Sequence, residues 1–282
     1  MRPLPPYLTT LIAMLAFAGN SLLCRAALRD TTIDPGSFTT LRIVAGALTL
    51  WLIMRLRTQV SPAGAAGNWA SALALFGYAA AFSYAYVSLS TGTGALLLFG
   101  AVQATMIGVG LWRGERLGAW QTVGLVLAGA GLVGLLLPGL SAPPLAGALL
   151  MLGSGVAWGI YSLRGKGTGD PTQVTAGNFL RATVPAAALT LASLPLARLD
   201  LAGAGYAIAS GALTSGMGYA VWYAALRHLR ATTASTVQLS VPVIAALGGA
   251  ALLAEPVTGR LVLASAAVLG GIALVILRKP GS

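Results

Sequence analysis

The chain has 282 residues, of which 57% are hydrophobic and only 8% are charged, and its formal net charge is +11. A soluble domain carries about 25% charged residues, so this chain has too few of them to cover a water-facing surface. The composition therefore excludes an ordinary soluble protein and indicates one that lies in a lipid bilayer.

Ten apolar stretches follow one another along the chain. A bilayer core about 30 Å thick needs about 20 helical residues to cross it, and each stretch is close to that length. The sequence therefore predicts an all-α integral membrane protein with ten transmembrane helices. The predicted helices cover 7–28, 36–56, 69–90, 94–112, 118–137, 145–164, 173–195, 202–226, 232–253 and 257–277.

An excess of positive charge can indicate a protein that binds nucleic acid. In this chain, however, the positive residues are distributed as in a membrane protein. If the first helix starts inside, the inward segments hold most of the cations and the outward segments hold Arg25, Arg29, Arg198 and Arg260. Cytoplasmic loops carry such an excess of Lys and Arg. We therefore expect a multi-pass protein of the cell inner (plasma) membrane, with both termini in the cytoplasm and no nucleic-acid partner. The inward cations are Arg2, Arg55, Arg57, Arg113, Arg116, Arg164, Lys166, Arg227, Arg230, Arg278 and Lys279.

The second half of the chain repeats features of the first. Glu115 in "LWRGERLGAW" returns as Glu255 in "LLAEPVTGRL", and Gly108 and Gly248 have the same spacing. Each half holds five predicted helices, and because five is odd the second half must enter the membrane upside down. We expect a first repeat over 1–138 and a second, inverted repeat over 145–279, a plan that recurs in transporters with a substrate site between the halves.

These features resemble the drug/metabolite transporter superfamily, in its EamA-type branch. The resemblance rests on "AWG" at 157–159, on "LR" near the start of the second and seventh helices, and above all on "SVPVIAALGGAALLAEPV" around Pro242. Trp158 in "VAWGIYS" is similar to a tryptophan of the YddG-type aromatic amino-acid exporters. One departure is Val102, which stands in the first half where Pro242 stands in the second. The resemblance implies a ten-helix carrier that exports small metabolites.

Polar and aromatic residues inside the bilayer are candidates for a solute site, because lipid offers them no partner. The competing interpretation for the aromatic residues is packing or an interfacial belt. The predicted cavity is lined mainly by the first, third, fourth, sixth, eighth and ninth helices. The candidate substrate-binding residues are Asn20, Tyr78, Phe99, Gln103, Trp158, Tyr161, Tyr219, Trp222 and Gln238.

Two arginines lie about two turns inside predicted helices. Arg42 and Arg181 could each have a structural role, by capping carbonyl groups or by pairing with Asp34 or Asp170, or could contact a carboxylate of the substrate. The sequence leaves both alternatives open.

Several kinds of chemistry are not indicated. All six acidic residues fall in turns or at helix ends, and the only histidine, His228, lies in a turn, so no acid–base pair for an enzyme and no buried proton relay is visible. No cluster has metal-ligand spacing, and we expect no cofactor.

Glycines recur in the fifth and tenth predicted helices. Because small residues let helices approach closely, they suggest close packing of these two helices at the periphery. The glycines are Gly124, Gly129, Gly131, Gly134, Gly270 and Gly271.

The sequence as a whole predicts a transporter that is not an enzyme. We expect it to export small metabolites, aromatic or other neutral amino acids first among them, by alternating access and facilitated diffusion, as a monomer or weak dimer. The alternatives are a different solute, such as a nucleotide sugar, a polyamine or a lipophilic cation, and a membrane-embedded enzyme or scaffold.

Overall fold

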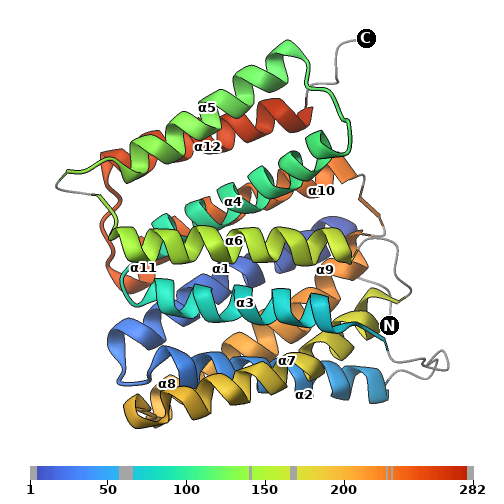
Figure 1. Cartoon of the computed structure of the whole chain (residues 1–282), viewed down its shortest axis with the longest axis vertical. Coiled ribbons are helices and arrows are strands. Elements are labelled where there is room, and N and C mark those ends of the chain that lie inside the picture. Colours follow the sequence, from blue (N-terminus) through green and yellow to red (C-terminus); the bar gives the residue numbers. More distant parts are fainter. Residues whose placement is uncertain are drawn as a thin grey trace.

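A computed structural model describes residues 5–56, 66–139, 142–165, 170–226, 228–229 and 231–277. Within these ranges every regular element is a helix. The elements in chain order are α1 (Pro6–Asp30), α2 (Pro35–Leu56), α3 (Trp69–Tyr86), α4 (Thr91–Trp112), α5 (Ala119–Leu136), α6 (Leu145–Arg164), α7 (Pro171–Ser193), the 3-10 turn η1 (Leu194–Leu196), α8 (Leu201–Ala209), the π-helix η2 (Ser210–Met217), α9 (Gly218–Leu226), α10 (Ala231–Gln238), α11 (Ser240–Leu253) and α12 (Gly259–Leu277). The helices run side by side, and α1 begins on the side of the molecule where α12 ends (Figure 1).

Two of the ten predicted helices are interrupted. The ninth is divided at Leu239 into α10 and α11, because Pro242 has no N–H to bond the carbonyl of Gln238 and its ring crowds that carbonyl. Val102 takes the place of this proline in the first repeat, and α4 accordingly runs unbroken from Thr91 to Trp112. The eighth helix widens from α8 into η2 and narrows again into α9.

Eight helices in the described part of the chain are long and apolar enough to cross a bilayer. The remaining two are α3, which carries several Ser and Tyr residues, and the eighth helix, which η2 divides. Large apolar side chains face outward along the helices, such as Leu263, which is 74% exposed, and Leu247, which is 63% exposed. Such a surface suits lipid rather than water. The protein is an all-α integral membrane protein of ten helices.

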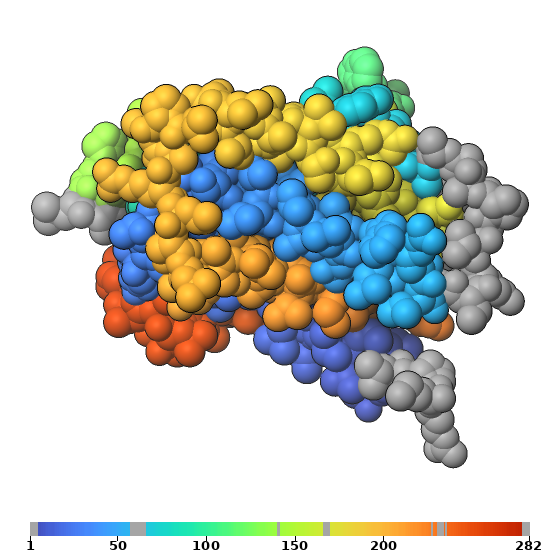
Figure 2. All heavy atoms as spheres, turned by 90° about the horizontal axis from the view of Figure 1, so that it is seen from below, coloured from blue at the N-terminus to red at the C-terminus, as the bar shows by residue number. Residues whose placement is uncertain are grey.

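The packing of the helices confirms two inverted five-helix repeats. Equivalent helices of the two halves pack against each other, namely α5 on α12, α4 on α11 and α2 on α7. Other contacts occur in related pairs: α3 packs on α6 as α9 packs on α1, and α4 packs on α6 as α11 packs on α1. Figure 2 shows one such arrangement on the lower face, where α2 lies between α7 and the eighth helix. A two-fold relation between the halves accounts for all of these pairs.

Acidic residues begin several of the helices. The carboxylate of Asp34 accepts from the main-chain N–H groups of Gly36 and Ser37, and the carboxylate of Asp200 accepts from Gly203. Burial alone would raise the pKa of Asp34, but hydrogen bonds from Ser37, Arg198 and Gly36 outweigh it and hold the pKa below its ordinary value. These carboxylates satisfy helix N-termini and stay ionised near neutral pH, which explains their place at helix ends.

The outermost pair of helices is α5 and α12, at the top of Figure 1. A Cβ atom on Gly124 would lie 2.5 Å from the carbonyl oxygen of Gly271, and one on Gly131 would lie 2.8 Å from Cβ of Ala267. These three glycines therefore permit the predicted close approach of the two backbones. Gly129, Gly134 and Gly270 do not serve this packing, because nothing lies within 4 Å of a Cβ atom placed on them.

The repeated glutamates have different surroundings at the two ends of the molecule. Glu255 accepts from Nε of Arg25 at 2.9 Å and from the main-chain N–H of Thr91 at 2.7 Å, and so ties the α11–α12 turn to α1 and α4. The carboxylate of Glu115 is exposed and has no hydrogen bond or ion pair in the described part of the chain. We call the Glu255–Arg25–Thr91 contact the Glu255 latch.

Gly108 and Gly248, each seven residues before its glutamate, also have different surroundings. A Cβ atom on Gly248 would lie 2.7 Å from Cδ1 of Leu22, whereas nothing lies within 4 Å of one on Gly108. Leu22 of α1 therefore packs against α11 at Gly248, and Gly108 has no equivalent contact. The cations Arg2, Arg57, Lys166, Arg227, Arg230, Arg278 and Lys279, which predict the orientation, lie outside the described residues.

Candidate solute-binding site

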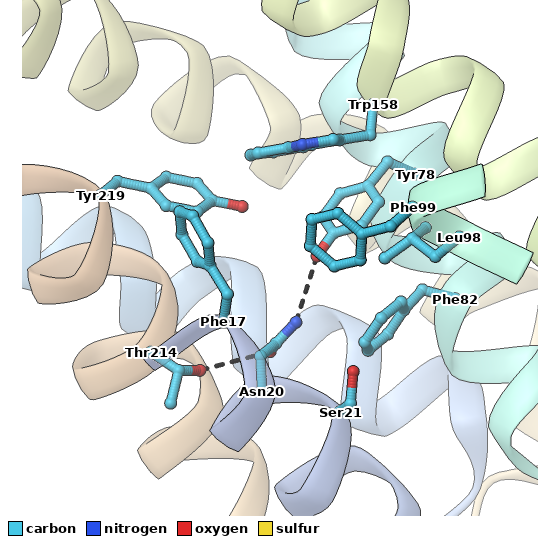
Figure 3. Close-up of a pocket in the computed structure, with 10 residues that line it drawn as sticks. All are labelled: Phe17, Asn20, Ser21, Tyr78, Phe82, Leu98, Phe99, Trp158, Thr214 and Tyr219. Carbon is cyan, nitrogen blue, oxygen red and sulfur yellow. Dashed lines mark hydrogen bonds between the residues drawn. The ribbon is translucent and has the colours of Figure 1, made fainter. Parts of the chain in front are cut away.

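A small cavity lies between helices of both repeats (Figure 3). Its walls come from α1, α3 and α4 in the first repeat and from α6, η2 and α9 in the second. The open space is about 20 Å³, which is room for about one water molecule, so the walls have closed on each other in this conformation. The lining residues are Phe17, Asn20, Ser21, Tyr78, Phe82, Leu98, Phe99, Trp158, Thr214 and Tyr219.

Asn20 is the polar centre of the cavity. Its Nδ2 donates to Oη of Tyr78 at 3.1 Å, and its Oδ1 accepts from Oγ of Ser210 at 2.7 Å and from Oγ1 of Thr214 at 3.3 Å. The two hydroxyl groups reach Asn20 from η2, so the widened helix supplies part of the site, as π-helical segments often do. One amide thus joins α1 to helices of both repeats.

Arg42 continues this network beyond Tyr78. Its side chain is 2% exposed, its Nη2 donates to Oη of Tyr78 at 2.8 Å, and its Nε makes a longer contact of 3.5 Å with Oγ of Ser215. Its guanidinium carbon lies 5.1 Å from the ring centre of Tyr78 and 4.9 Å from that of Phe82, within range of a cation–π interaction. Its Nη1 has no partner among the described residues. A buried, charged donor without a partner costs about 1–3 kcal/mol or more.

Aromatic rings form the opposite wall. Trp158 lies 4.8 Å from Tyr78, 5.2 Å from Tyr219 and 5.4 Å from Tyr161 between ring centres. Trp158 is only partly buried, unlike the tyrosines around it. Figure 3 shows its ring across the top of the pocket, facing the polar network of Asn20.

Five of the nine predicted binding residues line the cavity: Asn20, Tyr78, Phe99, Trp158 and Tyr219. The other four, Tyr161, Trp222, Gln103 and Gln238, are not among the lining residues. Tyr161 stacks on Trp158 from outside, and Trp222 packs edge-on against Phe17 at 5.8 Å. Gln103 is buried one helical turn beyond Phe99 on α4 and is not among the lining residues.

Gln238 and its helix do not contribute as expected. No described residue of the ninth helix lines the cavity, although the sequence predicts one there. Gln238 ends α10 at the break and donates from Nε2 to the carbonyl of Ala234 at 3.3 Å, while α11 packs against α1 and α4. At the break before Pro242, the side-chain amide of Gln238 thus bonds a carbonyl group of its own helix and does not reach the cavity.

The two repeated arginines have different environments. Nη1 of Arg181 donates to the carbonyl oxygens of Ala66 at 2.8 Å and Gly177 at 2.9 Å, which is the carbonyl-capping role. The neighbouring Asn178 accepts from the main-chain N–H of Asn68 at 2.9 Å and holds the same turn. Neither Arg42 nor Arg181 pairs with Asp34 or Asp170, so the predicted ion pairs are not formed.

Comparison with known proteins identifies the family. Residues 145–277 match the model of the EamA-like transporter family. An uncharacterised protein of Pseudomonas aeruginosa is 62% identical over 274 residues, which cover 97% of this chain and 95% of that protein. The threonine/homoserine exporter RhtA of Salmonella typhimurium is 32% identical over 144 residues, 48% of each chain. The chain belongs to the EamA-like transporter family.

The whole fold has a counterpart as well. A solved crystal structure superposes with a TM-score of 0.67 over 96% of this chain and 97% of that one, at 19% identity. An uncharacterised transporter of Archaeoglobus fulgidus is 29% identical over 214 residues, 74% of this chain and 77% of that protein. This EamA-like transporter therefore shares its architecture along nearly its full length with a known structure.

Several lining residues of this EamA-like transporter do not follow from sequence reasoning, namely Phe17, Phe82, Leu98 and Thr214. Helical spacing could have found two of them, since Phe17 is three residues before Asn20 and Phe82 is four after Tyr78, each on the same face as a predicted residue. Thr214 could not be found in this way, because its direction depends on the wide turn of η2. The described residues hold no cluster of His, Cys, Asp and Glu that could bind a metal ion.

Proposed function

We propose that this EamA-like transporter exports small metabolites, specifically amino acids with aromatic or other neutral side chains. The observation that carries the proposal is the cavity between the two repeats, where aromatic rings surround the polar pair of Asn20 and Tyr78. Sites of this composition hold amphipathic solutes by apolar contact and orient them by a few hydrogen bonds. The name of RhtA, an exporter of threonine and homoserine, is consistent with this solute class.

Alternating access is the proposed mechanism. Inverted repeats can exchange conformations, so that one end of the molecule opens while the other closes. The difference between the two ends supports this, since the Glu255 latch is formed and the Glu115 carboxylate is free in the described structure. We propose repeats over 1–138 and 145–279, a cytoplasmic Glu115 end, and a monomer or weak dimer in the inner membrane.

We further propose that transport follows the solute gradient alone. Coupling to protons needs a group that loads on one side and unloads on the other. The six acidic residues lie at helix ends or in turns, and the low pKa of Asp34 keeps it ionised at neutral pH. The cavity wall holds no carboxylate and no histidine.

Purified protein in liposomes tests these proposals. Labelled L-phenylalanine or L-threonine inside the vesicles should exchange with unlabelled solute outside, and an imposed pH gradient should not concentrate it. Asn20→Leu, which keeps the bulk and removes the hydrogen bonds, should lower the exchange about ten-fold or more. Cysteine labelling of an Arg2→Cys variant in a Cys24→Ala background gives the orientation.

Two outcomes would contradict the proposals. Absence of exchange for every neutral amino acid would reject the solute class. Accumulation driven by the pH gradient would reject facilitated diffusion while leaving the solute class intact.

A further inference from the structure

We propose that Arg42 attracts and holds the carboxylate of the solute, so that the cavity selects solutes bearing a carboxylate and rejects plain cations. The inference rests on the proposed function and narrows its solute class. Three observations support it. The charge of Arg42 has no acidic partner among the described residues, the polar groups at the cavity have donors left open, and the rings of Tyr78 and Phe82 lie between Arg42 and the cavity.

The charge of Arg42 is not balanced by the protein. An arginine stays protonated in a protein, so this buried side chain carries a full positive charge. Five of the six acidic residues bond to other groups: Asp30 to Arg29, Glu255 to Arg25, and Asp34, Asp170 and Asp200 to main-chain N–H groups at helix starts. The sixth, Glu115, is exposed at a helix end. A charged residue inside the membrane normally faces a partner or a transport path.

The acceptor atoms of the network are occupied, and several of its donors are not. Oη of Tyr78 accepts from both Asn20 and Arg42, so its own proton is available to a further acceptor. Oδ1 of Asn20 accepts from Ser210 at 2.7 Å, while Thr214 donates to the carbonyl of Ser210 at 2.7 Å and approaches Oδ1 only at 3.3 Å. One N–H of the Asn20 amide bonds Tyr78, and the second N–H is available as a donor. Nη1 of Arg42 is a donor without a partner. The open positions of Asn20, Tyr78 and Arg42 are therefore donors, and an ionised carboxylate is a ligand that only accepts.

Geometry places the arginine next to the open space. Tyr78 and Phe82 both line the cavity, and the guanidinium of Arg42 lies against both rings. A carboxylate that accepts the Tyr78 proton is then one hydrogen bond away from Nη2 of Arg42, in surroundings of low dielectric that strengthen the attraction. The faces of Trp158 and Tyr219 remain for the apolar or ammonium part of a zwitterion. A polyamine or lipophilic cation would meet the uncompensated charge and be repelled.

Pairs of ligands that differ only in the carboxylate test the inference. The unfolding temperature of the purified protein is measured with L-phenylalanine or L-phenylalaninamide, with L-threonine or L-threoninamide, and with 3-phenylpropanoate. The rise in unfolding temperature with ligand concentration gives the affinity of each ligand. The acids should bind at least about ten-fold more tightly than the amides, as expected for a hydrogen bond to a charged group. Arg42→Gln should remove this preference, and Arg42→Lys should keep part of it.

Two further variants complete the design. Tyr78→Phe keeps the ring but removes the hydroxyl between the solute and Arg42, and it should reduce the preference several-fold. Arg42→Lys, which keeps the buried charge, covers the case in which Arg42→Gln does not fold. Arg181→Gln is the matched control, because its guanidinium caps carbonyl groups outside the cavity, and it should leave the preference unchanged.

The outcomes separate the two proposals. Equal binding of acids and amides, binding of none of the acids, or an unchanged preference in both Arg42→Gln and Tyr78→Phe would overturn the inference. Arg42-dependent binding of acids in a protein that shows no exchange in liposomes would reject the transport proposal and support the carboxylate site.

Discussion

Trp158 both packs against neighbouring rings and lines the open space of the cavity. Trp158 touches three tyrosine rings, yet it is only partly buried and bounds the cavity. By contrast Tyr86 has no exposed surface and packs edge-on against Phe82 at 4.7 Å between ring centres, as a residue that serves packing alone does. We therefore propose that Trp158 is part of the wall that a bound solute contacts.

We expect Trp158→Ala to lower exchange in liposomes about ten-fold or more while the protein stays folded. Truncation of a fully buried aromatic residue costs about 3–5 kcal/mol, and the partly exposed Trp158 should cost less. Trp112→Ala is the control, because this side chain is 88% exposed at the end of α4. Size-exclusion profiles and specific exchange rates are measured together. Unfolding with a normal rate in the remaining folded protein would show that Trp158 serves packing instead.

Whole helices meet where residues are small. Gly124 of α5 faces Gly271 of α12, and Gly211 of η2 faces the main-chain carbonyl of Arg42, so that any side chain at either glycine would clash with backbone. In a bilayer, where lipid is as apolar as the helices, such close packing is a main source of helix association. Two contacts of this kind fix the outer helix pair and the position of the arginine.

Gly124→Ala should destabilise the α5–α12 pair by about 1–3 kcal/mol, because the added methyl group overpacks a backbone contact. Gly129→Ala lies on the same helix with open space at its Cβ position and should leave stability unchanged or slightly higher. Thermal unfolding in detergent compares the two variants. Equal unfolding temperatures would mean that the helix pair adjusts without loss.

The molecule as a whole is closed at one end by the Glu255 latch. Glu255 and Arg25 are both largely buried, with side chains 8% and 14% exposed, and together they hold α1, α4 and the α11–α12 turn. Glu115, the equivalent residue of the other repeat, holds nothing in the described structure. If the repeats exchange conformations, the latch should be released when its end opens.

Glu255→Gln should shift the molecule toward opening at the latch end. Replacing a charged hydrogen-bond acceptor by a neutral one loses about 1 kcal/mol, which is about a five-fold change in population. Leu22, which contacts Gly248 beside the latch, is changed to Cys in a Cys24→Ala background and labelled with an impermeant maleimide from that side. Labelling should be about five-fold faster, and Glu115→Gln should not accelerate it. Equal rates in both variants would show that the latch does not control opening.

Composition and spacing alone determined the class of the protein. Apolar runs near 20 residues predict the helices, and their length hardly depends on tertiary contacts because the bilayer thickness sets it. The echo of Glu115 at Glu255 predicts the two repeats, and the absence of a proline at Val102 matches the unbroken α4. Five of the lining residues were found because polar and large aromatic side chains are rare inside membrane helices.

Tertiary structure decided what those residues do. Arg42 and Arg181 both follow a leucine in the first half of equivalent helices. Arg42 nevertheless lies beside the cavity and Arg181 caps carbonyl groups, because their surroundings come from distant parts of the chain. The π turn of η2 directs Ser210 and Thr214 toward Asn20, and no local spacing predicts this. Likewise Glu115 and Glu255 have equivalent places in the two halves but different surroundings, because Arg25 and Thr91 reach only Glu255. A repeat in sequence specifies two equivalent local structures, whereas the packing between the halves makes them unequal.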